Sequence, residues 1–281
     1  MTSKPDLSPS QLLELAETDV CSALPQAVFS SIIAQPPFLI VPGTFNVRDV
    51  GLVPGSPIWA GYVFRSGSLE GLREDGFDQL AEKVGITRIF DLRAGHEREK
   101  YPEPSFLGAE FTWVPNSYVN AVDLADFVGN GGADGYCKMY MNMMEVYAPT
   151  IRAVLEHVRD RPREPFLFHC ALGRDRTGFV AGLLESIAGA DDETVLLDYL
   201  LTRIGSEPVR ERLLERAIRD NSCPEGLEDP AFNNLCSLRA ITWKLFVKQI
   251  EHKYGGFTGY VVDVLGFSKQ ELEQIIANLR G

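Results

Sequence analysis

Residues 165–178 read PFLFHCALGRDRTG, and this stretch decides the fold that we expect for the chain. Residues 165–168 are largely apolar and lead directly into His169 and Cys170, as a short aromatic strand would. The run FVAGLLE that follows Gly178 favours a helix. A strand, a loop and a helix in this order are typical of an α/β fold. We therefore expect a central, mostly parallel twisted sheet flanked by helices.

The segments before this stretch supply the other strands of the expected sheet. Residues 88–93, RIFDLR, read as a buried strand that ends in charge, which places Asp91 near the carboxyl end of that strand. Residues 111–115, FTWVP, are a second strand candidate. Residues 75–83 favour a helix that Gly85 ends.

Helical patterns dominate both ends of the chain. Residues 8–11, SPSQ, and 268–271, SKQE, each place a serine N-cap three residues before a glutamine or glutamate, and the first of these should open a docking helix. Residues 140–159 and most of the chain after residue 192 also favour helices. The glycine-rich residues 129–135 instead suit a flexible loop.

Composition and charge restrict the classes of function. The chain has 281 residues and a net charge of −12, so broad binding to nucleic acid or to an anionic membrane is unfavourable, and an anionic substrate must meet a local positive pocket. No apolar run reaches membrane-spanning length, and residues 1–16 do not resemble a secretory signal. We expect a soluble, cytoplasmic protein without integral membrane association; its oligomeric state stays open.

Cysteine usage agrees with a reducing compartment. The five cysteines are widely spaced, odd in number and without a C-x-x-C pair, which argues against a disulfide framework and a zinc ribbon. They are Cys21, Cys137, Cys170, Cys223 and Cys236.

The loop after Cys170 has the parts that phosphoryl transfer to a thiol requires. Backbone N–H groups at a helix N-terminus form an anion nest and lower the pKa of a cysteine placed there. Gly173 lets the backbone turn closely around the anion, and Arg176 can fork two donors onto phosphate oxygens. Thr177 is placed to hydrogen-bond the sulfur, and His169 to orient the loop. The expected phosphate-binding residues are Ala171, Leu172, Gly173, Arg174, Asp175 and Arg176.

Simpler interpretations of single residues do not explain the combination. A buried cysteine beside a histidine is usually core packing. Zinc binding by His169 and Cys170 lacks a second pair of ligands at suitable spacing. The ordered pattern His-Cys-x-x-Gly-x-x-Arg-Thr-Gly on a strand, loop and helix favours a cysteine-dependent phosphatase that needs no metal and no cofactor.

Several further motifs carry a family resemblance. Residues 46–51, NVRDVG, 63–69, VFRSGSL, and 90–93, FDLR, followed by Glu97, occur in this order before the Cys-x5-Arg loop. Together with residues 254–266 they resemble the protein tyrosine phosphatase superfamily, and within it the tyrosine-phosphatase-like family of bacteria and fungi that includes a mycobacterial secreted tyrosine and lipid phosphatase. The resemblance spans roughly residues 40 to 280.

This resemblance implies a three-layer phosphatase fold in one domain over residues 1–281, with added helical elements that form a lid. We expect an N-terminal docking helix region at 1–35, the core sheet and phosphate loop at 36–190, and a helical part at 191–281. It also implies hydrolysis through a phosphocysteine intermediate, acting on phosphotyrosine and also on phosphoserine or phosphothreonine in proteins. Arg174 stands where the family often has lysine.

The proton donor for the leaving group is not fixed by the loop. Residues 113–116, WVPN, have an amide, Asn116, where a Trp-Pro-Asp loop would have its acid. Asp91 is our first choice, because ligand-facing groups lie at the carboxyl ends of strands and the resemblance assigns an acid to the Asp-Leu-Arg position. Asp175 is the second, since a carboxyl group beside bound phosphate tends to hold its proton.

Other charged residues have weaker expected roles. Asp123 and Asp126 would reach the site only through a lid movement, and are otherwise solvated surface charges. Arg48, Asp49 and Arg65 should brace the phosphate loop without taking part in the chemistry.

Three alternative functions use the same residues differently. A phosphoinositide or inositol (poly)phosphate phosphatase would share the chemistry, and Arg174 would favour such highly anionic substrates. A non-catalytic phosphate-binding module is disfavoured because Cys170, Arg176 and Thr177 are all present. A sulfurtransferase also uses a loop cysteine, but the flanking residues argue against it.

Overall fold

The sheet matches the expected mostly parallel arrangement. The computed structural model describes residues 8–104, 109–116 and 122–281, and within them five strands pair in the order β1-β2-β5-β3-β4. Only the β1–β2 pair is antiparallel among these strands; the other three pairs are parallel. The strands are β1 (Arg48–Asp49), β2 (Val63–Ser66), β3 (Arg88–Asp91), β4 (Glu110–Thr112) and β5 (Phe166–His169).

The central strand places the phosphate loop at one edge of the sheet. In β5, His169 pairs with Ser66 of β2 on one side and with Asp91 of β3 on the other. The carboxyl ends of these three parallel strands therefore meet at one edge. Ligands of open α/β sheets bind outside the carboxyl ends of the strands, and the chain after His169 emerges there.

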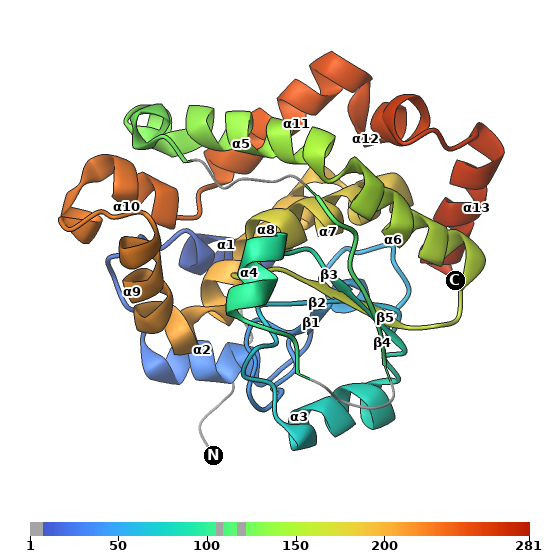
Figure 1. Cartoon of the computed structure of the whole chain (residues 1–281), viewed down its shortest axis with the longest axis horizontal. Coiled ribbons are helices and arrows are strands. Elements are labelled where there is room, and N and C mark those ends of the chain that lie inside the picture. The colour runs from blue at the N-terminus through green and yellow to red at the C-terminus, as the bar shows by residue number, and fades with distance from the viewer. Residues whose placement is uncertain (1–7, 105–108, 117–121) are drawn as a thin grey trace.

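Alternating residues of the strands fill two cores. Phe166 and Phe168 of β5 face the larger core, whereas Leu167 faces a smaller core that it shares with Phe77 and Leu80. This alternation follows from the two-residue period of a strand. Figure 1 shows the resulting layers, with α5 and α11 on one side of the sheet and α3 on the other.

Helices make up most of the remaining described residues. Those before the phosphate loop are α1 (Pro9–Ala16), α2 (Gln26–Ile33), η1 (Val50–Leu52), α3 (Glu74–Asp78), η2 (Gln79–Val84), α4 (Gly95–Lys100), η3 (Leu124–Phe127), η4 (Asn130–Gly132), α5 (Ala133–Val146) and α6 (Ala148–Asp160). Those from the loop onward are α7 (Asp175–Ala188), α8 (Asp192–Gly205), η5 (Glu207–Val209), α9 (Arg210–Asp220), η6 (Gly226–Glu228), α10 (Pro230–Cys236), α11 (Ala240–Tyr254), α12 (Gly256–Gly259), η7 (Tyr260–Val264) and α13 (Lys269–Arg280). None of the helices in the described part of the chain is long and apolar enough to cross a membrane.

Both predicted capping boxes are present. The Ser8 hydroxyl accepts from the backbone N–H of Gln11 at 3.3 Å, and the backbone N–H of Ser8 donates to Gln11 Oε1 at 2.9 Å. Ser268 and Glu271 repeat this exchange at the start of α13. Each pair satisfies amide groups that a helix N-terminus leaves free, which is why the serine fixes where the helix begins.

Residues 140–159 are helical as expected, with one break at Tyr147 between α5 and α6, where Pro149 lies in the first turn of α6. The prediction for residues 129–135 was wrong. Residues 129–135 are not a flexible loop: they form η4 and the first turn of α5. A Cβ on Gly135 would lie 2.8 Å from the carbonyl oxygen of Asp126, so this glycine permits close packing.

The helix expected over residues 75–83 is present in modified form. It starts as α3 and continues as the wider π-helical turn η2. Gly85 ends it in the left-handed conformation with φ +82°, as predicted.

Candidate active site

The loop after β5 turns sharply into the N-terminus of α7. Cys170 is 2% exposed, and Gly173 has φ +63°. A Cβ on Gly173 would lie 2.5 Å from the carbonyl oxygen of Ser66 and 2.7 Å from the amide nitrogen of Gly67. Glycine is therefore required here both by the backbone angle and by the approach of the neighbouring strand end.

Buried polar side chains hold this turn by hydrogen bonds to the Gly173 carbonyl. The Gly173 carbonyl accepts from Arg65 Nη2 at 3.0 Å and from Asn46 Nδ2 at 3.1 Å. Arg48 in turn donates to the Asn46 side chain, and both arginines pair with the buried carboxylate of Asp198 on α8. The structure thus places Arg48 and Arg65 where the bracing role was predicted. No sequence motif marks Asp198, which lies in α8 within a run of buried residues from Thr194 to Gly205.

Asp49 lies in a different environment from the one that we predicted. Its carboxylate accepts from the amides of Gly51 at 2.8 Å and Gly61 at 2.6 Å, so it holds the connection between β1 and β2. No hydrogen bond in the described part of the chain joins it to the phosphate loop. Asp49 thus supports the β1–β2 connection, whereas the expectation was that it would brace the phosphate loop.

The electrostatic environment favours the thiolate of Cys170. Burial alone raises the pKa of this thiol, but the charge of Arg176 and hydrogen bonds from the hydroxyl and amide of Thr177 outweigh burial. The pKa consequently lies below its ordinary value. The Thr177 hydroxyl is buried and has no other hydrogen-bond partner among the described residues, so it is available to the sulfur.

Arg176 is held in place by a carboxylate on another element. Glu97 in α4 binds both terminal nitrogens of Arg176, with a distance of 2.9 Å to Nη2. Arg176 also donates to the Leu92 carbonyl at 3.3 Å and the Tyr147 hydroxyl at 3.4 Å. Burial raises the pKa of Tyr147 to about 12, so this hydroxyl stays neutral. Glu97 was known only as part of a motif, and its contact with Arg176 is visible only in the fold.

The carboxylate of Asp91 is enclosed by arginines. It is 1% exposed and accepts from the Arg93 amide at 2.9 Å, from Arg93 Nε and Nη2 at 3.0 Å, and from Arg98 Nε at 2.8 Å. Burial opposes ionisation, but the charge of His169 and the bonds from Arg93 outweigh it and hold the pKa of Asp91 well below its usual range. Such a group is a poor proton donor, and it does not line the pocket beside Cys170.

The histidine of the motif belongs to the same buried network. His169 Nε2 lies 3.2 Å from Glu103 and 3.9 Å from Asp91, and His169 Nδ1 lies 3.4 Å from the Cys170 carbonyl oxygen. Burial lowers the pKa of His169, but the two carboxylates outweigh this effect and raise it. These three side chains have the spacing of a metal site. The Arg93 guanidinium already pairs with both carboxylates, however, so the positive charge there is supplied by the protein.

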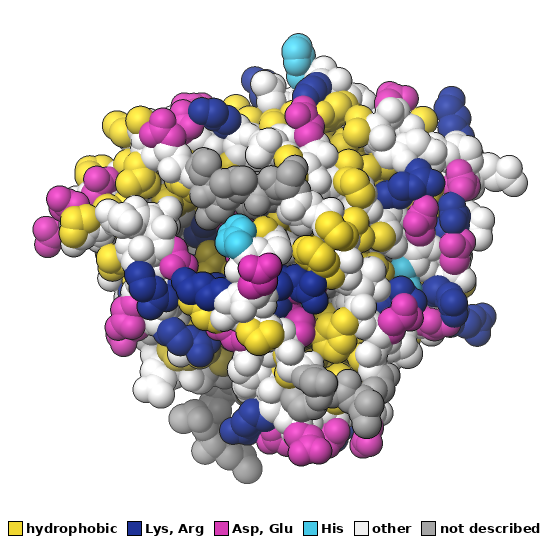
Figure 2. Space-filling view, viewed as in Figure 1, with side chains coloured by type: hydrophobic (Ala, Val, Ile, Leu, Met, Phe, Trp, Pro, Cys, Tyr) yellow, Lys and Arg dark blue, Asp and Glu magenta, His cyan; other side chains and the backbone are white. Residues whose placement is uncertain are grey.

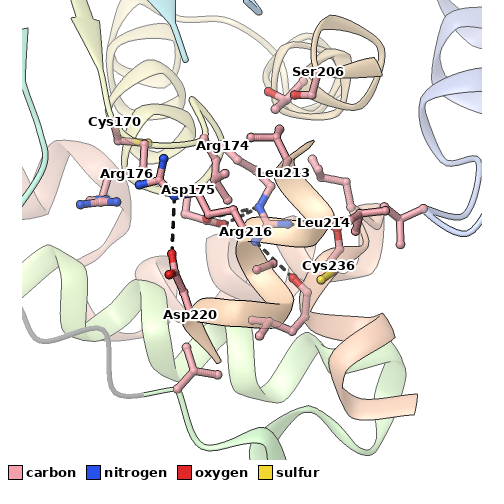
Figure 3. Close-up of a pocket in the computed structure, with 18 of the residues that line it drawn as sticks. Cys170, Arg174, Asp175, Arg176, Ser206, Leu213, Leu214, Arg216, Asp220 and Cys236 are labelled. Atoms are coloured by element: carbon pink, nitrogen blue, oxygen red, sulfur yellow. Dashed lines mark hydrogen bonds and ion pairs between the residues drawn. The ribbon is translucent and has the colours of Figure 1, made fainter. Parts of the chain in front are cut away.

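Asp175 lines the pocket, as do the acidic residues Glu97 and Asp220. Asp175 is the first residue of α7 and lines the pocket together with Cys170 and Arg176. Its carboxylate accepts from the Tyr140 hydroxyl at 2.8 Å and from Arg174 Nε at 3.1 and 3.2 Å. Figure 3 shows these loop residues in one pocket with side chains of α9.

The side chain of Arg174 lines the pocket, but its guanidinium is bound within the protein. Its two terminal nitrogens donate to the carbonyls of Cys236 and Leu235, both at 3.1 Å, and its guanidinium lies 5.5 Å from the ring centre of Tyr136. With Nε on Asp175, all three nitrogens are in use. Arg174 attaches α10 to the loop, and the expectation that it favours highly anionic substrates stays a prediction.

Much of the remaining pocket wall comes from α9, which supplies the apolar side chains of Leu213 and Leu214 and the charged side chains of Arg210 and Arg216. Figure 2 shows a hollow on this face, with Lys and Arg side chains beside it. The apolar lining residues include Met139, Met143, Leu213, Leu214, Leu235 and Leu238. The pattern RERLLERAIRD of α9 signalled an amphipathic helix, but not which site it borders.

The two aspartates considered for a lid movement lie outside this pocket. Asp126 forms an ion pair with Lys138 at 2.6 Å, and Asp123 caps η3 by accepting from the Ala125 amide. Both are therefore occupied on the surface, in agreement with the simpler interpretation.

Comparisons with known proteins give relatives over almost the whole chain. A tyrosine-protein phosphatase of Nostoc commune is 25% identical over 278 residues, which covers 95% of this chain and 94% of the relative. The triple specificity protein phosphatase PtpB of Mycobacterium tuberculosis is 24% identical, covering 86% of this chain and 98% of the relative. Among solved structures, the core catalytic domain of the yeast PP-IP phosphatase SIW14 is 16% identical, covers 66% of this chain and 98% of that domain, and has a TM-score of 0.35, a similarity too distant to carry an argument.

The family comparison matches the part of the chain that carries all the motifs. The model of the tyrosine phosphatase family matches residues 39–281, from the segment before β1 to the last residue. The match includes the loop with Cys170 and Arg176 as well as Glu97. The chain therefore belongs to the tyrosine phosphatase family.

Proposed function

We propose that the chain hydrolyses phosphomonoesters through a phosphocysteine intermediate on Cys170. The observation that carries this proposal is the position of Cys170 at the N-terminus of α7, where its pKa is lowered beside Arg176. Amide groups at that helix end and the positive charge of Arg176 stabilise both the thiolate and the oxygens of a bound phosphate.

In the first step the thiolate of Cys170 attacks phosphorus. The S–P bond forms while the bond between phosphorus and the leaving oxygen breaks, and Asp175 gives its proton to that oxygen. We assign this role to Asp175 rather than Asp91, because Asp175 lines the pocket and Asp91 is enclosed by arginines at 1% exposure. Arg176, oriented by Glu97, stabilises the equatorial oxygens.

In the second step water attacks phosphorus on the phosphocysteine. Asp175, now a carboxylate, takes a proton from this water, the S–P bond breaks, and the thiolate of Cys170 leaves as inorganic phosphate forms. The Thr177 hydroxyl donates to the departing sulfur and stabilises its charge.

The apolar part of the pocket wall favours a phosphate ester on an aromatic ring. Leu213 and Leu214 of α9, with Met139 and Met143 of α5, line the same pocket as the loop. Burial of a ring against these side chains is favourable, so we propose phosphotyrosine in proteins as the main substrate. Phosphoserine and phosphothreonine offer no ring and should be weaker substrates.

A second candidate substrate class rests on two further arginines. Arg210 and Arg216 of α9 also line the pocket, and Arg216 forms ion pairs of 3.5 Å with Glu70 and Asp220. These side chains would suit a phosphoinositide or an inositol phosphate. Turnover of a phosphotyrosine peptide compared with that of inositol phosphates at equal concentration separates the two substrate classes.

The chemistry is tested by hydrolysis of p-nitrophenyl phosphate in the presence of a chelator, against pH. We expect Cys170→Ser to be inactive and wild type to give a radioactive phosphoenzyme when a ³²P-labelled substrate is quenched with acid. We expect Asp175→Asn to lose rate and the basic limb of the pH profile, and Asp91→Asn to keep that limb. Full activity in Cys170→Ser would refute the proposal, and loss of the basic limb only in Asp91→Asn would return the acid to Asp91.

A further inference from the structure

Two buried tyrosines lie behind Asp175. Tyr140 comes from α5 and Tyr199 from α8, and their side chains are 0% and 1% exposed. The Tyr140 hydroxyl lies 2.9 Å from the Tyr199 hydroxyl and donates to Asp175 Oδ1 at 2.8 Å. The three groups therefore form a short chain of hydrogen bonds that ends on the carboxylate in the pocket.

The direction of this chain follows from the number of protons. Tyr140 has one hydroxyl proton, and the carboxylate of Asp175 can only accept it. Tyr199 must then donate to the Tyr140 oxygen. Burial, together with the charge of Asp175, raises the pKa of both tyrosines far above the physiological range, so both remain donors.

We propose that Tyr140 is a positioning residue for proton transfer: it occupies Asp175 Oδ1, so that the proton exchanged with the substrate resides on Oδ2. Tyr199 fixes the direction in which the Tyr140 hydroxyl points. This inference rests on the proposed role of Asp175 and adds residues that no sequence motif contains.

Among the described residues, Tyr140 is the hydrogen-bond donor that distinguishes the two carboxylate oxygens of Asp175. In the part of the chain that the structure describes, hydrogen bonds to the Asp175 carboxylate come from Tyr140 and Arg174. Arg174 Nε lies at almost equal distances from the two oxygens and does not distinguish them. The titratable or charged groups that face Asp175 are Arg174, Tyr136, Tyr140, Tyr199, Cys170 and Cys236.

The variant Tyr140→Phe removes only the hydroxyl and keeps the ring against Phe246 and Trp243. The measurement is kcat/KM, which reports formation of the phosphocysteine and not its hydrolysis, on phenyl phosphate and on 2,4-dinitrophenyl phosphate. We expect a loss of about tenfold on phenyl phosphate, whose leaving oxygen needs a proton, and less than about twofold on the dinitrophenyl ester, whose leaving group departs as a stable anion.

The pH profile gives a second readout that a structural role would not move. A carboxylate that loses a hydrogen-bond donor is less stable in its charged form, so the basic limb on phenyl phosphate should move to higher pH in Tyr140→Phe. In the background of Asp175→Asn, Tyr140→Phe should cause no further loss on phenyl phosphate, because its effect passes through Asp175.

The control is Tyr260→Phe. Tyr260 is also buried and donates to a carbonyl, that of Met144, at 2.6 Å, but it does not contact Asp175. We expect a comparable decrease in thermal stability and no change in the ratio of the two substrates. Tyr199→Phe should reproduce the effect of Tyr140→Phe in weaker form, and it serves as the test variant if Tyr140→Phe does not fold.

The experiment distinguishes failure of the positioning role of Tyr140 from failure of the proposed acid, Asp175. An equal loss on both esters in Tyr140→Phe, or an additive loss in the double variant, overturns the positioning role while the mechanism stands. If Asp175→Asn itself shows no dependence on the leaving group, the proposed acid is wrong, and the positioning role falls with it.

Discussion

Gly173→Ala gives the sharpest test of how the fold shapes the phosphate loop. The added Cβ would lie 2.5 Å from the Ser66 carbonyl oxygen, whereas ordinary contact begins near 3.4 Å, so the loop and the end of β2 must separate by about 0.9 Å. The Gly173 carbonyl is held by Arg65 and Asn46, and the loop therefore cannot move without loss of those hydrogen bonds.

The expected consequences separate activity from stability. A displacement of about 1 Å at a reacting group costs about 100-fold in rate, and we expect that loss in kcat/KM on p-nitrophenyl phosphate. An alanine at φ +63° adds about 1–2 kcal/mol of destabilisation by itself. Gly61→Ala is the matched control, because Gly61 has φ +84° and no atom within 4 Å of an added Cβ.

The assay compares kcat/KM and urea unfolding for the two variants. Gly61→Ala should lose about 1–2 kcal/mol of unfolding free energy and keep wild-type kcat/KM. A folded Gly173→Ala whose kcat/KM stays within about threefold of wild type would refute the reasoning, because the loop would then tolerate the displacement.

Three further predictions concern the charges of the site. In Glu97→Gln, Arg176 loses its bidentate partner, and we expect kcat to fall at least about tenfold in steady-state assays; an unchanged kcat contradicts this. Asp91→Asn should destabilise the fold by about 3–5 kcal/mol in urea at neutral pH, because it removes one of the two carboxylates that pair with the buried guanidinium of Arg93. The pKa of Asp91 is lowered by folding, so this difference is present above about pH 4 and should shrink as the pH falls further; a pH-independent difference would argue against it. The lowered pKa of Cys170 predicts that alkylation by iodoacetamide reaches half its maximal rate below about pH 8.5, the pKa of a free thiol. A midpoint at or above that pH would contradict a lowered pKa for Cys170.

Local chemistry made much of the fold predictable. The strand at residues 166–169, the helix after Asp175 and the capping boxes at Ser8 and Ser268 all follow from neighbouring residues. Their signals are short-range, since a capping serine or an apolar run acts within one turn or one strand. Pro149 also signals the start of a new helix after the break at Tyr147, but the residues on both sides of the break favour helix as well.

The order of residues determined by itself the nucleophile candidate Cys170, its arginine Arg176 and the glycine between them, because one loop contains them and its amides form the anion nest. Only the tertiary structure shows how the environments of the two candidate acids differ. In the sequence, Asp91 and Asp175 both belong to motifs of the expected site. In the structure, arginines enclose the Asp91 carboxylate, whereas Asp175 lines the pocket. The fold also brought Tyr140 to Asp175 from 35 positions away. Such contacts depend on how distant helices pack, and no local pattern encodes that packing.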